Sequence, residues 1–168
     1  YSYNNIEQDN NSVSETFVLS SGSNFSKNEI NCNLKGEYSS AFVNGILSLD
    51  NDKHHEIRTI VNHLTENTKS YQLIKSVLED NSKAVYQGKI FVNSDAQKTD
   101  GYQLSKAILL SKDSEFNAKP ELEIYADDVK CSHGSASGNL NEDSIFYLMS
   151  RGLNYQQSRE LLINGFLL

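Results

Sequence analysis

An internal repeat of strand-like segments is the feature that most constrains the fold of this chain. Residues 70–78 (SYQLIKSVL) align with residues 101–109 (GYQLSKAIL), so that Tyr71 matches Tyr102. A further step of the same length back from Tyr71 reaches residues 40–47, which keep the apolar positions. Self-similarity at a fixed period is typical of a β-solenoid, in which stacked coils form the core that one coil cannot form alone.

A second pair of segments extends the repeat to another part of each coil. Residues 89–92 match residues 121–124 at nearly the same period. We therefore expect equivalent strands to stack at about 4.8 Å, with Leu73 and Leu104 pointing the same way into the core. A β-sandwich stays open as an alternative, because alternating strands do not specify a topology.

Short runs of β-branched and aromatic residues, bounded by Gly, Asn, Asp or Ser, predict the individual strands. The first dozen residues are polar and are expected to be frayed or to form an edge strand. Pro120 is expected just ahead of a strand, where its missing N–H does little harm. The predicted strand segments are 16–19, 41–43, 57–61, 90–92 and 122–125.

Composition narrows the function classes. Apolar residues make up 38%, which suits a thin, elongated architecture, and the formal net charge of -7 argues against nucleic acid as a partner. No apolar run approaches the ~20 residues that span a bilayer, so we expect no membrane segment. Cys32 and Cys131 could pair in an oxidising compartment, but nothing else suggests secretion, and a reduced, cytoplasmic setting is favoured. The chain lacks an initiator Met, and we expect it to be a fragment of a longer protein.

The character of the chain changes near its end, where two helices are expected. Asn141 is a predicted N-cap with acidic residues in the first turn, and Gly152 lies where this helix should stop. Asn154 is expected to cap a second helix, with Gln157 in a capping box. We predict a β-helix core over residues 1–138 and a helical region over residues 139–168.

The two helices have two compatible interpretations. They can form a cap that packs on the last coil and shields the open end of the solenoid, with Phe146, Leu148 and Leu161 buried. They can also provide a docking site for a partner.

One segment, residues 121–134 (ELEIYADDVKCSHG), contains the best candidates for chemistry. On a strand, Val129, Cys131 and His133 share one face, and a thiol with an imidazole can hold a soft or borderline metal. Two ligands do not fill a tetrahedral site, so donors from another chain or from a metal cluster would be needed. The alternative is that Cys131 is a small core residue and His133 its hydrogen-bonded neighbour.

The remaining polar residues are weaker candidates. His54 and His55 are adjacent, so on a strand they should face opposite ways, and with His63 they are predicted to be structural. The loop of residues 95–100 is expected to be solvated. Asp127 and Asp128 would be the acid and base of a carbohydrate-active enzyme, but adjacent acids on a strand point to opposite faces.

Three segments resemble one family. Residues 119–134, 95–100 and 145–152 are similar, in order and spacing, to the SufD branch of the SufB/SufD family of iron–sulfur cluster assembly proteins. The resemblance covers at least residues 54–168, whereas residues 1–53 carry only compatible strand patterning. SufB sequences differ at the Lys-Cys-Ser-His-Gly step, which favours SufD.

The resemblance implies a right-handed parallel β-helix with a helical carboxy-terminal region, and a non-enzymatic scaffold. It implies a complex with SufB and the ATPase SufC, in which a transient iron–sulfur cluster forms at the SufB–SufD interface and no cofactor is tightly bound in isolation. His133 matches the family's metal-binding histidine, with Cys131 beside it. We expect His133 near the end of a strand, at least partly reachable by a second chain. SufC would dock on the helical region, for which the candidate residues are Phe146, Tyr147, Arg151 and Gly152. Compared with this family, we expect the amino-terminal helical part to be missing from this chain and the last helix to be cut short at Leu168.

Two alternatives from other classes stay open at this point. One is the carbohydrate-active β-helix enzyme, and the other is a homodimeric β-helix module without metal chemistry. The second follows because an exposed sheet edge invites pairing with a like chain.

Overall fold

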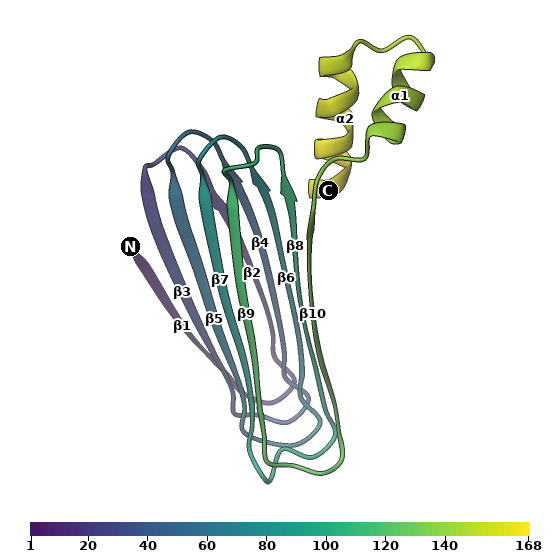
Figure 1. The fold of residues 1–168 in the computed structure, drawn as a ribbon. Helices are drawn as coiled ribbons and strands as arrows, with labels where there is room; N and C mark the ends of the chain where they lie inside the picture. The colour runs from purple at the N-terminus through teal and green to yellow at the C-terminus, as the bar shows by residue number, and fades with distance from the viewer.

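The computed structural model describes all of residues 1–168, which form ten strands followed by two helices (Figure 1). No helix is long and apolar enough to cross a membrane. The strands are β1 (Ser2–Gln8), β2 (Val13–Ser20), β3 (Phe25–Leu34), β4 (Ser40–Leu49), β5 (His54–His63), β6 (Lys69–Leu78), β7 (Lys83–Val92), β8 (Thr99–Leu109), β9 (Glu115–Ile124) and β10 (Val129–Gly138), and the helices are α1 (Glu142–Ser150) and α2 (Tyr155–Leu167).

The strands form two parallel five-stranded sheets that face each other (Figure 1). The first sheet has the order β1-β3-β5-β7-β9 and the second has the order β10-β8-β6-β4-β2. The chain therefore crosses from one sheet to the other after every strand, and each coil contributes one strand to each sheet. The prediction of a parallel β-helix followed by a short helical region is confirmed, and the β-sandwich alternative is wrong.

The register between strands confirms most of the repeat. Tyr71 pairs with Tyr102 and Lys89 pairs with Glu121, as the aligned segments predict. The alignment of residues 40–47 with the segment that begins at Tyr71 is wrong by two residues, because Tyr71 pairs with Phe42 and not with Ser40. That coil is shorter than the next one, in part because the turn between β5 and β6 has fewer residues than the turn between β7 and β8.

The prediction that Leu73 and Leu104 enter the core is wrong. They are paired and point the same way, but both are only partly buried and lie on the outer face of the second sheet. The side chains that alternate with them point inward and are buried, among them Gln72, Ile74 and Gln103. Both faces of these strands carry apolar residues, so a period of two residues cannot tell which face is inside.

The interior between the sheets is filled by three apolar clusters along the solenoid. The first is built around Leu47, Ile74 and Tyr86, and a second lies around Ile30 and Val61. The third lies toward the last coil and consists of Ile90, Val92, Ala96 and Ala126, with Leu122, Val129 and Cys131 packed against it. Burial of these side chains between the sheets is the main source of stability for the stacked coils.

Strands β1 and β9 are the two edges of the first sheet, which confirms the edge-strand expectation for the amino end. Pro120 lies inside β9, paired with Gly88, and not ahead of a strand as predicted. A proline is tolerated there because the outer side of an edge strand has no neighbour that needs its N–H.

The helix termini are as predicted. Asn141 caps α1 through its side-chain oxygen, which accepts from the Ser144 N–H at 2.9 Å. Asn154 and Gln157 form the expected capping box at the start of α2. Gly152 follows α1 with φ +98°, a conformation that a residue with a side chain rarely adopts.

The helices do not cover the open end of the solenoid. They lie beyond the ends of the strands, and α2 is attached to the second sheet near β6 (Figure 1). Arg159 donates to the Glu79 carboxylate at 2.6 Å, and Lys75 donates to the Leu167 carbonyl at 3.3 Å. The expectation of a shielding cap on the last coil is therefore wrong, and the outer edges of β9 and β10 are uncovered.

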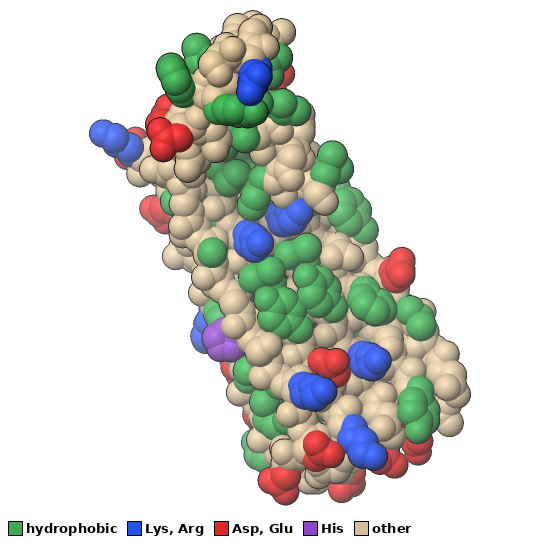
Figure 2. Space-filling model, turned by 90° about the vertical axis from the view of Figure 1, so that its right-hand side faces the viewer, with side chains coloured by type: hydrophobic (Ala, Val, Ile, Leu, Met, Phe, Trp, Pro, Cys, Tyr) green, Lys and Arg blue, Asp and Glu red, His purple; other side chains and the backbone are tan.

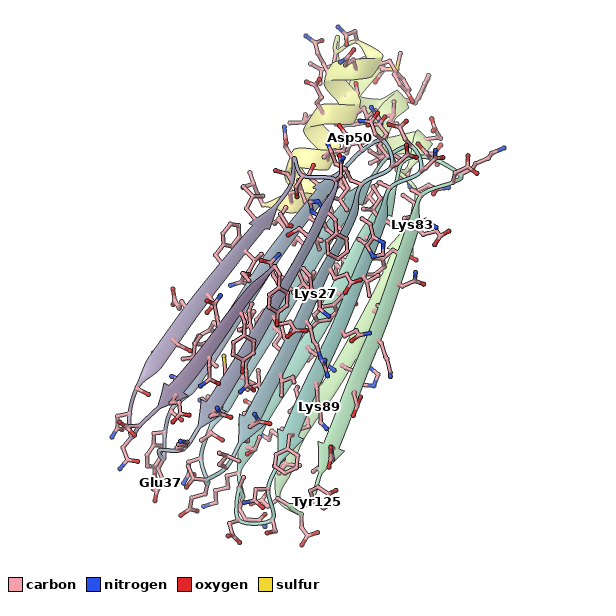
Figure 3. All side chains as sticks on the ribbon, turned by 90° about the vertical axis from the view of Figure 1, so that its left-hand side faces the viewer. Lys27, Glu37, Asp50, Lys83, Lys89 and Tyr125 are labelled. Carbon is pink, nitrogen blue, oxygen red and sulfur yellow. The ribbon has the colours of Figure 1, made fainter.

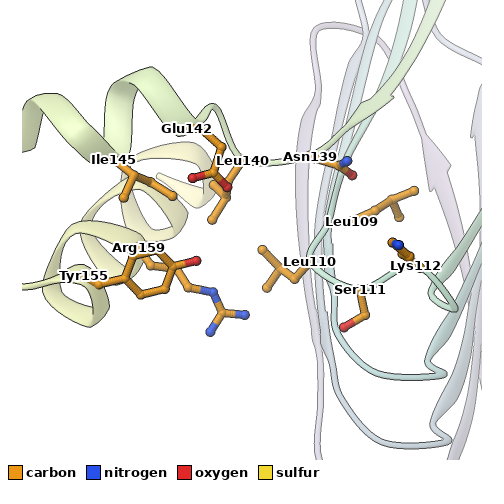
Figure 4. Close-up of a pocket in the computed structure, with 10 residues that line it drawn as sticks. All are labelled: Leu109, Leu110, Ser111, Lys112, Asn139, Leu140, Glu142, Ile145, Tyr155 and Arg159. Atoms are coloured by element: carbon orange, nitrogen blue, oxygen red, sulfur yellow. The ribbon is translucent and has the colours of Figure 1, made fainter.

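The residues that anchor the helices also differ from the prediction. Phe146 is 74% exposed and Leu161 is 52% exposed, whereas Ile145 is only 3% exposed. Leu148 is partly buried. A cavity of about 200 Å³ separates α1 and α2 from the end of β8 and is lined by Leu110, Ile145 and Tyr155 among others (Figure 4). The division into domains at residue 138 stays a prediction, although the change from strand to helix lies between Gly138 and Glu142.

Candidate functional site

His133 lies in the middle of β10, the last strand of the second sheet, and not near a strand end as expected. It pairs with Gln103 of β8, whose side chain points into the solenoid, so His133 has the same inward orientation. No further coil stacks beyond β10, and for this reason the imidazole is exposed although its face is the inner one. A second chain that approaches this open end can therefore reach the ring.

Cys131 is two residues away on the same face and is half-buried. It packs against the apolar cluster of the last coil together with Val129. Its thiol fills the space beside Gly101, where an added Cβ would lie 3.3 Å from Sγ. Burial raises the pKa of the Cys131 thiol, the Gly101 backbone N–H opposes this rise, and the Asp100 carboxylate adds to it. The Cys131 side chain therefore packs against the core, and its free sulfur also lies at the open end of the solenoid, where it can act as a metal ligand.

The arrangement offers two donors at one edge and no complete metal site. Residues i and i+2 of a strand are about 6.6 Å apart along the backbone, so a thiol and an imidazole at these positions can contact neighbouring atoms of one small cluster. Nowhere in the chain do three His, Cys, Asp or Glu side chains come together as a metal site. A metal or cluster bound at His133 and Cys131 would therefore need donors from outside the chain.

Buried polar side chains occupy part of the solenoid interior, from Gln72 to Ser105 beside β10. They were not predicted from the sequence. Ser105 of β8 donates to Ser135 of β10 at 3.0 Å, two residues beyond His133 on the same face. Deeper inside, Gln72 accepts from the Tyr86 hydroxyl at 3.3 Å and also from Thr59. The repeat could have predicted the two buried glutamines, because both copies contain the sequence Tyr-Gln-Leu and the Gln of each is buried.

The other histidines have structural environments. His55 is fully buried, with Nδ1 2.8 Å from the Ser20 hydroxyl and Nε2 2.7 Å from the Ser23 carbonyl. His63 is fully buried between Thr68 and Ser70, and burial lowers its pKa to about 4.

His54 points outward from the same strand, with its ring packed edge-on to Phe25 at 5.7 Å. The prediction that His54 and His55 face opposite ways is therefore confirmed. None of the three histidines lies in the coil that carries His133.

The acidic pair and the polar loop of residues 95–100 differ from their expected settings. Asp127 and Asp128 lie in the turn between β9 and β10 and not on a strand. The Asp128 N–H donates to the side-chain oxygen of Gln97 at 2.9 Å, which ties this turn to the loop of the preceding coil. Within that loop, Ala96 and Thr99 are buried, so the expectation of a fully solvated loop is wrong.

The four candidate docking residues lie on α1 and just after it. Phe146 and Tyr147 are exposed, and the Arg151 guanidinium lies 5.2 Å from the centre of the Tyr147 ring. Gly152 follows directly. Both cysteines of the chain are free, Cys32 in the core and Cys131 at the open end.

Comparisons with known proteins show the family to which the chain belongs. The family model described as the SufBD core domain of the SUF system for iron–sulfur cluster assembly matches residues 1–166. The iron–sulfur cluster assembly protein SufD of Escherichia coli is 36% identical over 96% of this chain and 38% of its own length.

Other SufBD family proteins match as well. One from Synechocystis is 46% identical over 56% of the chain and 21% of its own length. One from Pyrococcus horikoshii is 31% identical over 78% of the chain and 29% of its own length. The chain therefore spans less than two fifths of the length of these relatives, and it belongs to the SufBD family of iron–sulfur cluster assembly proteins.

Proposed function

We propose that this chain is the β-helix core of a SufD-type scaffold subunit. In this proposal it is non-enzymatic and acts in the cytoplasm, where it forms a complex with SufB and the ATPase SufC. The nascent iron–sulfur cluster is cargo that forms at the SufB–SufD interface, with no cofactor held tightly by the chain alone. The resemblance to SufD over nearly the whole chain supports this assignment.

The observation that carries the proposal is the position of His133. It has an exposed imidazole with no side-chain partner in its own chain, on a strand that is paired along one edge only. The free edge of β10 presents unpaired N–H and C=O groups, to which a partner strand can add. Strand addition would bring donors of the partner within reach of the inner face of β10.

The chemistry proposed for His133 is ligation of the growing cluster through a neutral imidazole nitrogen. A thiolate of SufB would supply the second protein donor, so that neither subunit holds the cluster alone. Cys131 is the further candidate on this chain. Its raised pKa disfavours the thiolate, which a bound metal would have to stabilise.

We further propose that SufC docks on the helical region through Phe146, Tyr147, Arg151 and Gly152. Two exposed aromatic side chains next to an arginine have the composition of an interface centre. Since α2 is joined to the second sheet through Arg159 and Glu79, movement of the helices would be passed to the solenoid.

The test is a substitution in the complete SufB–SufC–SufD complex. His133→Ala should reduce cluster assembly strongly, followed by iron and sulfide content and by visible absorbance, while size-exclusion chromatography shows an intact complex. Ser137→Ala is the matched control, because it is exposed on the same face of the same strand. Normal cluster assembly by the His133→Ala complex would contradict the proposal that His133 is a cluster ligand.

The free edge of β10 also favours a second candidate function, a homodimeric module without metal chemistry. Strand pairing with a second copy would use the same unpaired groups. Sedimentation of the full-length protein with and without SufB separates the two candidates. A homodimer that SufB does not displace, and that shows no loss of any activity on substitution of His133, would favour the module.

A further inference from the structure

The outer faces of the two sheets differ in character. On the first sheet, oppositely charged side chains neutralise each other, mostly across neighbouring strands. Lys83 pairs with Glu115 at 3.1 Å, Lys27 pairs with Glu56 at 3.8 Å, and Lys89 pairs with Glu123; the three lysines are labelled in Figure 3. This is an ordinary solvated face. The outer face of the second sheet contains none of the ion pairs of the protein.

Instead, the second sheet carries an apolar patch on its outer face. Phe17 is 63% exposed, Leu19 64% and Phe42 36%. Figure 2 shows hydrophobic side chains gathered in the middle of this face. The register of β2, β4, β6 and β8 places the members of the patch in three neighbouring rows, in which Asn44 lies between Phe17 and Leu73 and Glu15 lies beside Phe42. The members are Phe17, Leu19, Phe42, Ile46, Tyr71, Leu73, Tyr102 and Leu104.

Lysines border this patch at both ends of the strands. Lys69 and Lys130 lie in one row on one side, with the exposed Asp100 between them, and Lys75 and Lys106 share a row on the other side. None of the four forms an ion pair with a carboxylate of the chain. On this face the four lysines outnumber the two carboxylates, Asp100 and Glu15. The chain as a whole has a net charge of -7, so the excess of lysines around the apolar patch is a local exception that fits an acidic partner.

The protein already packs a helix beside this patch. Val77 belongs to the same outer face but is only 5% exposed, in the region where α2 is attached to β6. The Phe166 ring of α2 lies 5.8 Å from the Lys75 ammonium. A groove of about 220 Å³, lined in part by Phe17, Leu73 and Leu167, runs from the end of α2 onto the patch. The uncovered surface is therefore continuous with an existing helix–sheet interface.

We propose that this face binds an amphipathic helix with acidic flanks, supplied by a partner protein. The apolar side of the helix would cover Tyr71, Leu73, Tyr102 and Leu104, and its carboxylates would pair with the lysines at either end. Lys69 and Lys75 are six residues apart on one strand, a distance of about 20 Å, which a helix of about 13 residues spans. A second copy of this chain fits less well, because it would place one lysine border against another.

The test uses the full-length protein and labelled synthetic peptides. The probe is an amphipathic helix of about 13 residues with Leu on one face and Glu on the other, and the control peptide has Lys in place of Glu. By fluorescence anisotropy, the acidic peptide should bind about tenfold or more tightly than the basic one, with an affinity that falls as salt rises. Equal affinity for the two peptides would overturn the proposal.

Variants locate the binding surface. Leu104→Glu should weaken binding of the acidic peptide about tenfold or more, and Lys106→Glu should weaken it and flatten its salt dependence. Phe17→Ser serves as a second variant of the patch, because a side chain exposed to this extent contributes little to folding. Tyr3→Ser, an exposed tyrosine on the first sheet, is the matched control and should leave binding unchanged. Binding that none of the patch variants alters would overturn the proposal.

Two further outcomes would assign the patch to another occupant and overturn the proposal. One is association with phosphatidylserine vesicles that Leu104→Glu abolishes while the peptides fail to bind. The other is a dimer in sedimentation equilibrium that Phe17→Ser dissociates. Since His133 lies on the inner face of β10, His133→Ala should not affect peptide binding, so this test is independent of the proposed cluster chemistry.

Discussion

The phenol ring of Tyr71 stacks on that of Tyr102, with ring centroids 5.4 Å apart and planes inclined by 26°. The two residues are paired in register on β6 and β8, and Phe42 precedes them in the same row on β4. Aromatic side chains in equivalent positions of successive coils therefore form a column across the outer face of the second sheet. The column ties neighbouring coils together and also forms the centre of the proposed docking patch.

We expect the Tyr71–Tyr102 stack to be measurable as a coupling energy. Tyr71→Leu and Tyr102→Leu keep much of the apolar area but remove the ring pair, and in a double-mutant cycle the coupling should be about 0.5–1.5 kcal/mol. Urea unfolding of the full-length protein followed by circular dichroism gives the four free energies. Strictly additive effects would mean that the two rings stabilise their coils independently.

His63 should make the stability of the protein depend on pH. Burial lowers its pKa from 6.5 to about 4, so between these values the unfolded chain binds a proton that the folded chain does not. The stabilisation is complete above pH 6.5 and is lost as the pH falls toward 4, by on the order of 3 kcal/mol. The measurement is the urea midpoint across this range.

The His63→Gln variant is the control for this pH dependence. It removes the titrating group and should flatten the dependence between pH 6.5 and 4 relative to the wild type. An equally steep loss in both proteins would assign the effect to other groups.

Neighbouring residues of α1 should respond very differently to truncation. Ile145 is 3% exposed and Phe146 is 74% exposed. Ile145→Ala should lower the free energy of unfolding by about 2–5 kcal/mol, or release the helices from the solenoid, whereas Phe146→Ala should change it by less than about 0.5 kcal/mol. Hydrogen exchange of α1 and α2 distinguishes release of the helices from global destabilisation. A larger effect at Phe146 would contradict the packing described for α1.

The two cysteines should react at different rates and neither should be activated. Burial raises the pKa of Cys32 to about 11, and Cys131 has a raised pKa as well. Because the thiolate is the nucleophile, alkylation of Cys131 by iodoacetamide at pH 7 should be slower than that of a free cysteine peptide and should accelerate with pH. Cys32 should react only after unfolding, and peptide mass spectrometry measures both sites. Faster reaction of Cys131 than of the peptide would mean that its thiolate is stabilised in the folded protein.

The sequence alone was sufficient to predict the solenoid and the helix ends. A coil that stacks on its neighbour must place equivalent residues at equivalent positions, so Tyr71 and Tyr102 repeat in the sequence before they stack in space. Helix capping is equally local, since Asn154 and Gln157 satisfy each other's backbone groups within one turn. The common face of Cys131 and His133 follows from the geometry of a strand.

The tertiary structure decided which face of each strand lies inside, and what covers the open end. Leu73 is outside and Gln72 inside because the facing sheet supplies Thr59 of β5 and Tyr86 of β7 as partners for the glutamine, and no local pattern contains that information. In the same way, α2 is attached near the end of β6, where Arg159 donates to Glu79, a contact between residues 80 positions apart in the sequence. The sequence determined the local geometry of each coil and of each helix end. Only the tertiary structure decided that His133 is exposed, because exposure depends on whether a distant segment covers the residue, and no segment stacks beyond β10.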